Sequence, residues 1–197
     1  MRNVTETVKQ LIIINILFFI GTLLVSGPAY QYLALFFPEN PDFKAWQPIT
    51  YMFMHGGFMH ILFNMFALYS FGSALEQFWG GKKFLFFYIS CGLGSALVHT
   101  GVNYFHFQEG IDALISNGFS KSEILQLLNE GKIDTRWQEL LTVSEFQNFT
   151  SAYLGTAVGA SGAIYGIIVA FAFMFPNAEL GLMFIPIPIK AKYFVPG

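Results

Sequence analysis

Four long apolar stretches alternate with shorter polar or proline-containing segments along the chain. They cover residues 8–26, 51–75, 84–103 and 152–175. A transmembrane helix needs about 20 predominantly apolar residues, and each stretch is close to that length. The pattern therefore predicts an all-α polytopic membrane protein in which residues 1–197 form a single membrane domain with four transmembrane helices.

The first stretch has a second interpretation, because Arg2 and Lys9 lie at its start and small residues lie near Ser26. These features are also typical of a cleaved signal peptide. The apolar region of a signal peptide is usually only about 7–15 residues long, however, and further spans follow here. We therefore expect a retained transmembrane helix.

Composition supports the membrane class and excludes several others. Of the 197 residues, 54% are hydrophobic and 11% are charged, whereas a soluble domain carries about 25% charged residues. The chain has no basic stripe, so we expect no nucleic-acid partner. A single cysteine, Cys91, excludes a disulfide framework.

The longest polar segment covers residues 104–151 and is expected to be an insert with short amphipathic helices. Ser120 and Glu123 have the spacing of a capping box, and Gly131 suits the end of the helix that follows. Asp134 is a candidate cap for a second short helix. A surface loop with no direct part in chemistry is a simpler interpretation of this insert than a substrate-binding segment.

Two proline-containing segments are also predicted to be non-helical. Residues 27–50 contain four of the eight prolines, and Trp46 in this segment suits the headgroup level of a bilayer. Residues 176–197 contain the other four prolines, which favours a short β-like segment over a helix. The sequence stops at Gly197 without a polar tail, as expected of a truncated chain.

Basic residues are distributed unevenly among the loops. If the N-terminus is cytoplasmic, six basic residues lie on the cytoplasmic side and four on the other side. Three of those four lie in the long insert, where charge has little effect on orientation. We therefore expect a multi-pass protein with a cytoplasmic N-terminus, in the lipid bilayer of a bacterial cytoplasmic membrane.

Three polar side chains lie where lipid alone does not explain them. His60 and Asn64 are four residues apart and share one helix face, and Ser161 lies in a glycine-rich part of the fourth stretch. Counted from Tyr51 and Ala152, His60 and Ser161 each lie about nine residues into their stretches, or roughly 14 Å deep. Polar groups at membrane depth are costly and indicate function.

A structural role is the alternative for each of these features. Histidine and asparagine can bind a neighbouring helix, and the glycine pairs 155/159 and 162/166 are typical of close helix packing. Because the three polar groups are matched in depth on separate helices, a shared site is the better explanation.

Two other chemistries are disfavoured by the same residues. The sequence has no HExxH pair, and His55 and His60 are separated by about 140° around a helix. We therefore expect no metal site and no cofactor. No Asp or Glu lies inside an apolar stretch, which argues against an aspartyl intramembrane protease.

The polar residues belong to motifs that resemble those of the rhomboid intramembrane serine proteases. The likeness extends over nearly the whole chain outside the insert. It rests on His55-Gly-Gly-Phe-Met-His60-Ile-Leu-Phe-Asn64, on Gly159-Ala-Ser161-Gly162-Ala-Ile-Tyr165, and on Trp46-Gln47, Glu76 and Gly80-Gly81.

The resemblance implies a six-helix core that cleaves the transmembrane segments of other membrane proteins. Ser161 would be the nucleophile, and His60 and Asn64 would donate hydrogen bonds to the oxyanion together with the Ser161 amide. Gly159 and Gly162 would keep space around the hydroxyl.

One part of the family's pattern is missing. Its general base is a histidine on the sixth helix, whereas this chain has no histidine after His106. His60 cannot easily serve twice, because an oxyanion donor presents an N–H where a base presents a lone pair. We therefore expect a truncated protease without helices five and six, inactive as it stands, whose catalytic histidine lies beyond Gly197. The alternative is a non-catalytic protein that binds transmembrane helices.

Overall fold

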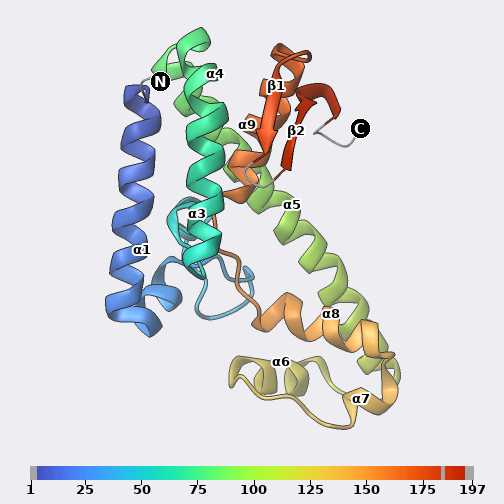
Figure 1. The fold of residues 1–197 in the computed structure, drawn as a ribbon. Helices are drawn as coiled ribbons and strands as arrows, with labels where there is room; N and C mark the ends of the chain where they lie inside the picture. Colours follow the sequence, from blue (N-terminus) through green and yellow to red (C-terminus); the bar gives the residue numbers. More distant parts are fainter. Residues whose placement is uncertain (1–3, 183–184, 194–197) are drawn as a thin grey trace.

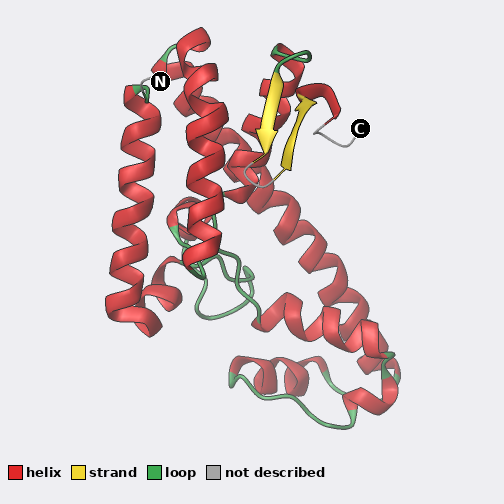
Figure 2. Ribbon diagram, in the orientation of Figure 1, coloured by secondary structure: helices red, strands yellow, loops and turns green. Residues whose placement is uncertain are grey.

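The computed structural model describes residues 4–182 and 185–193, which form a helical bundle with a long side arm (Figure 1). Figure 2 shows that helices dominate and that one hairpin lies near the C-terminus. The helices and strands are α1 (Glu6–Leu33), α2 (Gln47–Thr50), α3 (Phe58–Ala67), α4 (Ser73–Trp79), α5 (Gly81–Ser116), α6 (Lys121–Asn129), α7 (Trp137–Leu140), α8 (Val143–Leu154), α9 (Ser161–Met174), β1 (Glu179–Leu182) and β2 (Ile185–Lys190).

The expectation of an all-α polytopic membrane protein is confirmed. Among the described residues, three helices are long and apolar enough to cross a membrane: α1, α5, and the continuous helix Phe58–Trp79, in which a π-helical turn joins α3 to α4. The fourth apolar helix, α9, has only 14 residues. The β-like segment expected after Pro176 is the antiparallel hairpin of β1 and β2.

Helix α5 is much longer than the sequence predicts. It continues from Gly81 to Ser116, so the helix does not end where the predicted apolar span ends, near Asn103. Its 36 residues correspond to about 54 Å at 1.5 Å per residue, more than the roughly 30 Å of a hydrocarbon core. Figure 1 shows α5 running away from the bundle and carrying α6, α7 and α8 at its far end.

Residues 117–154, which we call the cap, pack against this far end of α5. The cap has an apolar core of its own, separate from the core of the bundle. Gly110 of α5 makes the contact possible, because a Cβ there would lie 2.3 Å from a ring carbon of Phe149. The core consists of Phe37, Phe107, Ile111, Leu114, Ile124, Leu128, Trp137, Leu141, Phe149, Ala152 and Tyr153.

The helix ends within the cap agree in part with the sequence. The Ser120 side chain accepts a hydrogen bond from the Glu123 amide, as predicted, and Gly131 after α6 has a φ of 66°. A complete capping box is formed instead by Thr142 and Glu145, which the sequence analysis did not identify. Short polar side chains at these helix starts satisfy N–H groups that have no partner inside the helix.

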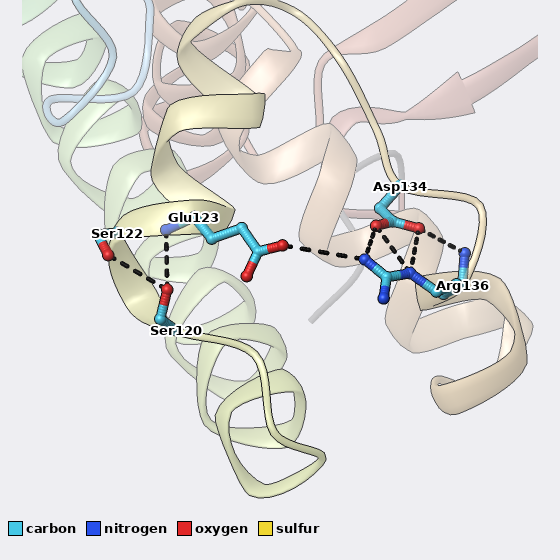
Figure 3. A network of polar contacts seen from close by, with 5 residues as sticks. All are labelled: Ser120, Ser122, Glu123, Asp134 and Arg136. Carbon is cyan, nitrogen blue, oxygen red and sulfur yellow. Dashed lines mark hydrogen bonds and ion pairs between the residues drawn. The ribbon is translucent and has the colours of Figure 1, made fainter.

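Asp134 does not cap the second short helix directly, because α7 begins at Trp137. The Asp134 carboxylate instead accepts hydrogen bonds from the backbone and guanidinium of Arg136 (Figure 3). Arg136 also lies 3.9 Å from Glu123 and over the Phe119 ring. This network joins α6 to the loop before α7 on the exposed side of the cap.

A loop of residues 34–46 connects α1 to α2 and is organised by the Gln47 side chain. Gln47 is fully buried. Its amide nitrogen donates to the carbonyl oxygens of Gln31 and Asp42, and its amide oxygen accepts from the Lys44 amide. These bonds satisfy irregular backbone that no helix or sheet supports.

Glu76 of α4 holds the start of α1. Its carboxylate accepts hydrogen bonds from the Thr5 hydroxyl and from the amides of Thr7 and Val8. The first N–H groups of a helix have no intrahelical partner, and a carboxylate at the positive end of the helix dipole is favourable. Glu76 therefore fastens two transmembrane helices at one end of the bundle.

His55 is enclosed in the non-helical residues that precede α3. It is 1% exposed, and neither ring nitrogen makes a hydrogen bond of normal geometry in the described part of the chain. Burial and the charge of nearby His60 lower its pKa from 6.5 to about 4, and the Phe53 carbonyl offsets only part of this effect. His55 is therefore neutral in the folded protein near neutral pH.

Replacing Glu76 with alanine is expected to lower the free energy of unfolding by about 2–3 kcal/mol, because hydrogen bonds to a charged group are lost together. Denaturant unfolding in detergent micelles measures this change. Glu6→Ala is the matched control, because Glu6 is an exposed acidic residue beside the same helix start. An equal decrease in the free energy of unfolding in the two variants would show that the hydrogen bonds of Glu76 do not stabilise the start of α1.

The pKa of His55 predicts a loss of stability in acid. Between about pH 7 and pH 5 the unfolded chain binds a proton at His55 and the folded protein does not, so the melting temperature falls as the pH falls. A His55→Phe variant should show a smaller fall over the same range, measured by thermal unfolding in one detergent. Identical slopes would exclude His55 as the cause.

Candidate active site

Ser161 is the first residue of α9, and non-helical residues 155–160 precede it. The predicted continuous span from Ala152 is therefore wrong, because α8 ends at Leu154. Ser161 was expected to lie about nine residues into this helix, and that expectation is also wrong because Ser161 is the first residue of α9. A helix of 14 residues is about 21 Å long, shorter than a hydrocarbon core of roughly 30 Å. α9 alone is therefore shorter than a full membrane span.

Segment 155–160 is held by backbone hydrogen bonds to two other parts of the chain. Ala157 pairs with Leu35 of loop 34–46 in both directions, at 2.9 and 3.0 Å. The Gly159 amide donates to the Tyr51 carbonyl at 2.9 Å. The polar backbone before Ser161 is thus satisfied without a helix.

Gly159 explains why the helix cannot begin earlier. Its φ of 126° lies in a region that residues with a Cβ rarely adopt. A Cβ at this position would lie 2.7 Å from Nε2 of His60 and 3.6 Å from Oγ of Ser161. The imidazole and the hydroxyl therefore border the same small space, as the sequence analysis expected for Gly159.

His60 and Asn64 are the third and seventh residues of α3. His60 is the third residue of this helix, not the tenth residue of a span that begins at Tyr51, because a 3₁₀ turn and residues 54–57 come first. His60 and Ser161 are therefore both near the starts of their helices. The predicted meeting of the side chains occurs, although the count of helical residues was wrong for both helices.

A cavity of about 470 Å³ between α3 and α9 brings the three predicted site residues together. Most of its surface is apolar, as in many small-molecule and cofactor sites. It is lined by Met59, His60, Phe63, Asn64, Ala67, Ser161, Ile164, Tyr165 and Ile168.

Hydrogen bonds define which atoms of His60 and Asn64 remain free. The Gly56 amide donates to Nδ1 of His60 at 3.4 Å, so the neutral ring carries its proton on Nε2, the atom nearest Gly159. The Asn64 amide nitrogen donates to the His60 carbonyl at 2.9 Å and retains a second hydrogen. Both side chains can therefore donate a hydrogen bond to a ligand.

A second cavity, of about 770 Å³, borders Ser161 on the side of α5. His99 lines this cavity, and the sequence analysis did not identify it as a neighbour of Ser161. Its Nε2 lies 3.0 Å from the Asn103 amide nitrogen, which occupies the lone pair of Nε2. The periodic spacing of Ser95, His99 and Asn103 on one helix face was the signal available in the sequence.

Close packing of α9 on α5 separates the two cavities. A Cβ at Gly162 would lie 2.2 Å from Oγ of Ser95, and one at Gly166 would lie 2.4 Å from Sγ of Cys91. For the pair 162/166, the alternative of a helix-packing role is supported. Gly162 accommodates α5, and it also lines the second cavity together with Ser161. Within the described ranges, no group of three or more His, Cys, Asp and Glu side chains gathers in a way that could hold a metal ion.

Comparison with known proteins shows which domain family and which relatives this chain resembles. Residues 42–122, which include His60 and Asn64, match the Rhomboid domain. The chain is 24% identical to the Haemophilus influenzae rhomboid protease GlpG over 160 residues, which are 80% of this chain and 78% of that protein. It is 32% identical over 88 residues to GlpG of Klebsiella pneumoniae, covering 45% of this chain and 32% of that protein.

A match to a yeast protein covers only a small part of that protein. The chain is 24% identical over 136 residues to Rhomboid protein 1, mitochondrial, of Saccharomyces cerevisiae, covering 69% of this chain but only 27% of the yeast protein. The chain thus spans about a quarter of that relative's length. The matched domain and these relatives show that this all-α multi-pass membrane protein is similar to rhomboid proteins over the matched residues.

Proposed function

We propose that the chain is part of an intramembrane serine protease that cleaves transmembrane segments of other membrane proteins. The observation that carries this proposal is the single cavity lined by Ser161, His60 and Asn64 from two different helices. Several relatives are named rhomboid proteases, which supports the same reaction class.

Ser161 is proposed as the nucleophile, whose oxygen attacks the scissile carbonyl carbon. The carbonyl oxygen then becomes an anion that needs hydrogen-bond donors fixed in advance. Nε2–H of His60 and the free amide hydrogen of Asn64 are two such donors. The Ser161 amide is a third, because the first N–H groups of α9 have no intrahelical partner and lie at the positive end of its dipole.

The general base is proposed to be a histidine outside residues 1–197, forming a Ser-His dyad. None of the four histidines in the chain meets the requirements of a base. His60 presents an N–H to the cavity, His55 is enclosed, and Nε2 of His99 is occupied by Asn103. His106 lies far along α5 and faces Glu109 at 3.5 Å.

The proposed substrate is a transmembrane helix that enters the cavity from the lipid. The apolar lining, with Met59, Phe63 and Ile168, suits lipid-soluble side chains. Carbonyl groups in a helix are hydrogen-bonded internally, so the substrate has to unwind near Ser161 before attack. We propose a cytoplasmic N-terminus and a bacterial cytoplasmic membrane as the setting, and the chemistry needs neither a metal nor a cofactor.

The second candidate function is a rhomboid-like protein that binds transmembrane helices without cutting them. It is favoured by the same observation about the histidines, since no described imidazole offers a free lone pair to Ser161. The two candidates share the cavity and differ only in whether a base reaches the hydroxyl.

Substitutions in the full-length protein, reconstituted with a model transmembrane substrate, test the assignment. Ser161→Ala should abolish cleavage, and His60→Ala or Asn64→Ala should lower kcat by about 10²–10³, the loss expected for one oxyanion donor. His99→Ala is the control histidine and should change kcat by less than about threefold. Cleavage is followed by the appearance of the product on gels.

Equal cleavage by Ser161→Ala and the unsubstituted protein would exclude the proposed nucleophile. Loss of cleavage in His99→Ala equal to that in Ser161→Ala would instead identify His99 as the base. Substrate that binds but is never cut by the unsubstituted protein would support the non-catalytic candidate.

A further inference from the structure

The cap and loop 34–46 pack and hydrogen-bond to each other, next to the segment of chain that leads to Ser161. Phe37 of the loop is 3% exposed and lies within the apolar core of the cap. Its ring centroid is 5.0 Å from that of Phe107 and 5.8 Å from that of Tyr153. Figure 1 shows α8 leading from the cap back toward this loop before the chain enters α9.

Polar contacts fix the same junction at the end of α8. The Asn40 amide nitrogen donates to the Tyr153 carbonyl at 3.0 Å. The buried Tyr153 hydroxyl lies 3.0 Å from the Glu39 carbonyl and also contacts the Asn129 side chain of α6. One residue of α8 is therefore bonded both to the loop and to the interior of the cap.

Segment 155–160 begins two residues after Tyr153 and has no regular secondary structure to fix it. The same loop that binds Tyr153 also pairs with Ala157 through Leu35. Loop 34–46 thus contacts the chain on both sides of Gly155, and the position of Ser161 depends on how firmly that loop is held. Gln47 holds the loop from the side of α2, and the cap holds it from the other side.

We propose that Asn40 and Tyr153 are positioning residues for Ser161. They fasten the cap to loop 34–46, and the loop in turn holds the extended backbone from which Ser161 projects. The cap, through this link, is a scaffold for the active site and not only a surface insert. The inference rests on the proposed function in one respect, namely that Ser161 is the residue whose orientation matters for cleavage.

Two substitutions at Asn40 separate this role from ordinary loop folding. The Asn40 side chain also accepts a hydrogen bond from the Asp42 amide through its oxygen. Asn40→Asp keeps that acceptor and replaces the donor to Tyr153 with a carboxylate oxygen that repels the Tyr153 carbonyl, whereas Asn40→Ala removes both the acceptor and the donor. Tyr153→Phe removes the hydroxyl and keeps the aromatic ring in the cap core. Arg136→Gln is the control, because it changes the exposed network of the cap without touching loop 34–46.

The variants are made in the full-length protein, and two quantities are measured. Hydrogen exchange at the amides of Ala157 and Gly159 reports how firmly segment 155–160 is held. In Asn40→Asp and Tyr153→Phe this exchange should accelerate about three- to tenfold, as expected for loss of one hydrogen bond. The kcat for a transmembrane substrate should fall by a similar factor, about three- to tenfold, with KM changed less than about twofold. Arg136→Gln should change neither quantity.

Unchanged exchange at both amides in Asn40→Asp and Tyr153→Phe would overturn the inference, even if the variants melt at a lower temperature. A loss confined to Asn40→Ala would also overturn it, because Asn40 would then act only through Asp42. If the unsubstituted protein does not cleave, the proposed function fails, and the exchange measurement still decides whether the cap holds the segment.

Discussion

The rest of this structure depends on one requirement: backbone N–H and C=O groups outside the helices need hydrogen-bond partners. A polypeptide within a bilayer has to satisfy every N–H and C=O internally, so non-helical backbone survives only where protein encloses it. Segment 155–160 is non-helical backbone between two helices, and it obtains hydrogen-bond partners from Leu35 and Tyr51. These partners from loop 34–46 and from the residues before α3 allow α9 to begin as late as Ser161.

The late start of α9 also determines the chemistry available to Ser161. A serine in the middle of a helix has its own amide committed to a carbonyl four residues earlier, whereas a serine at the first position does not. Gly159 enforces this start through its positive φ and through the nearness of His60. A single glycine thus connects the backbone geometry to the convergence of the two side chains.

The apolar pattern identified the helices but not the points where they break. Hydrophobicity continues from Ala152 to Phe175 and from Tyr51 to Leu75, so a count of apolar residues placed Ser161 and His60 too far inside their helices. The breaks come from φ angles and backbone pairing, which leave no trace in hydropathy. Both residues lie nearer the starts of their helices than predicted. Because the two positions shift in the same way, the side chains still border one cavity, as predicted.

Contacts between distant segments were the least predictable part of the site. Motif spacing singled out His60, Asn64 and Ser161, because these polar residues are conspicuous in apolar surroundings. His99 also lies in an apolar stretch, but its place beside Ser161 depends on which face of α5 meets Gly162, and the sequence does not give that contact. The link between Asn40 and Tyr153 joins residues 113 positions apart. Neither the proline-containing segment around Asn40 nor the start of the apolar stretch at Tyr153 indicates a partner.

Ser161 and Tyr165 border both cavities, one on each side of α9. Ser161 is therefore reached from two spaces, one beside α3 and one beside α5. Under the proposed function, a substrate chain seated beside α3 would leave the space beside α5 unfilled, so the site would keep room for solvent while it is occupied.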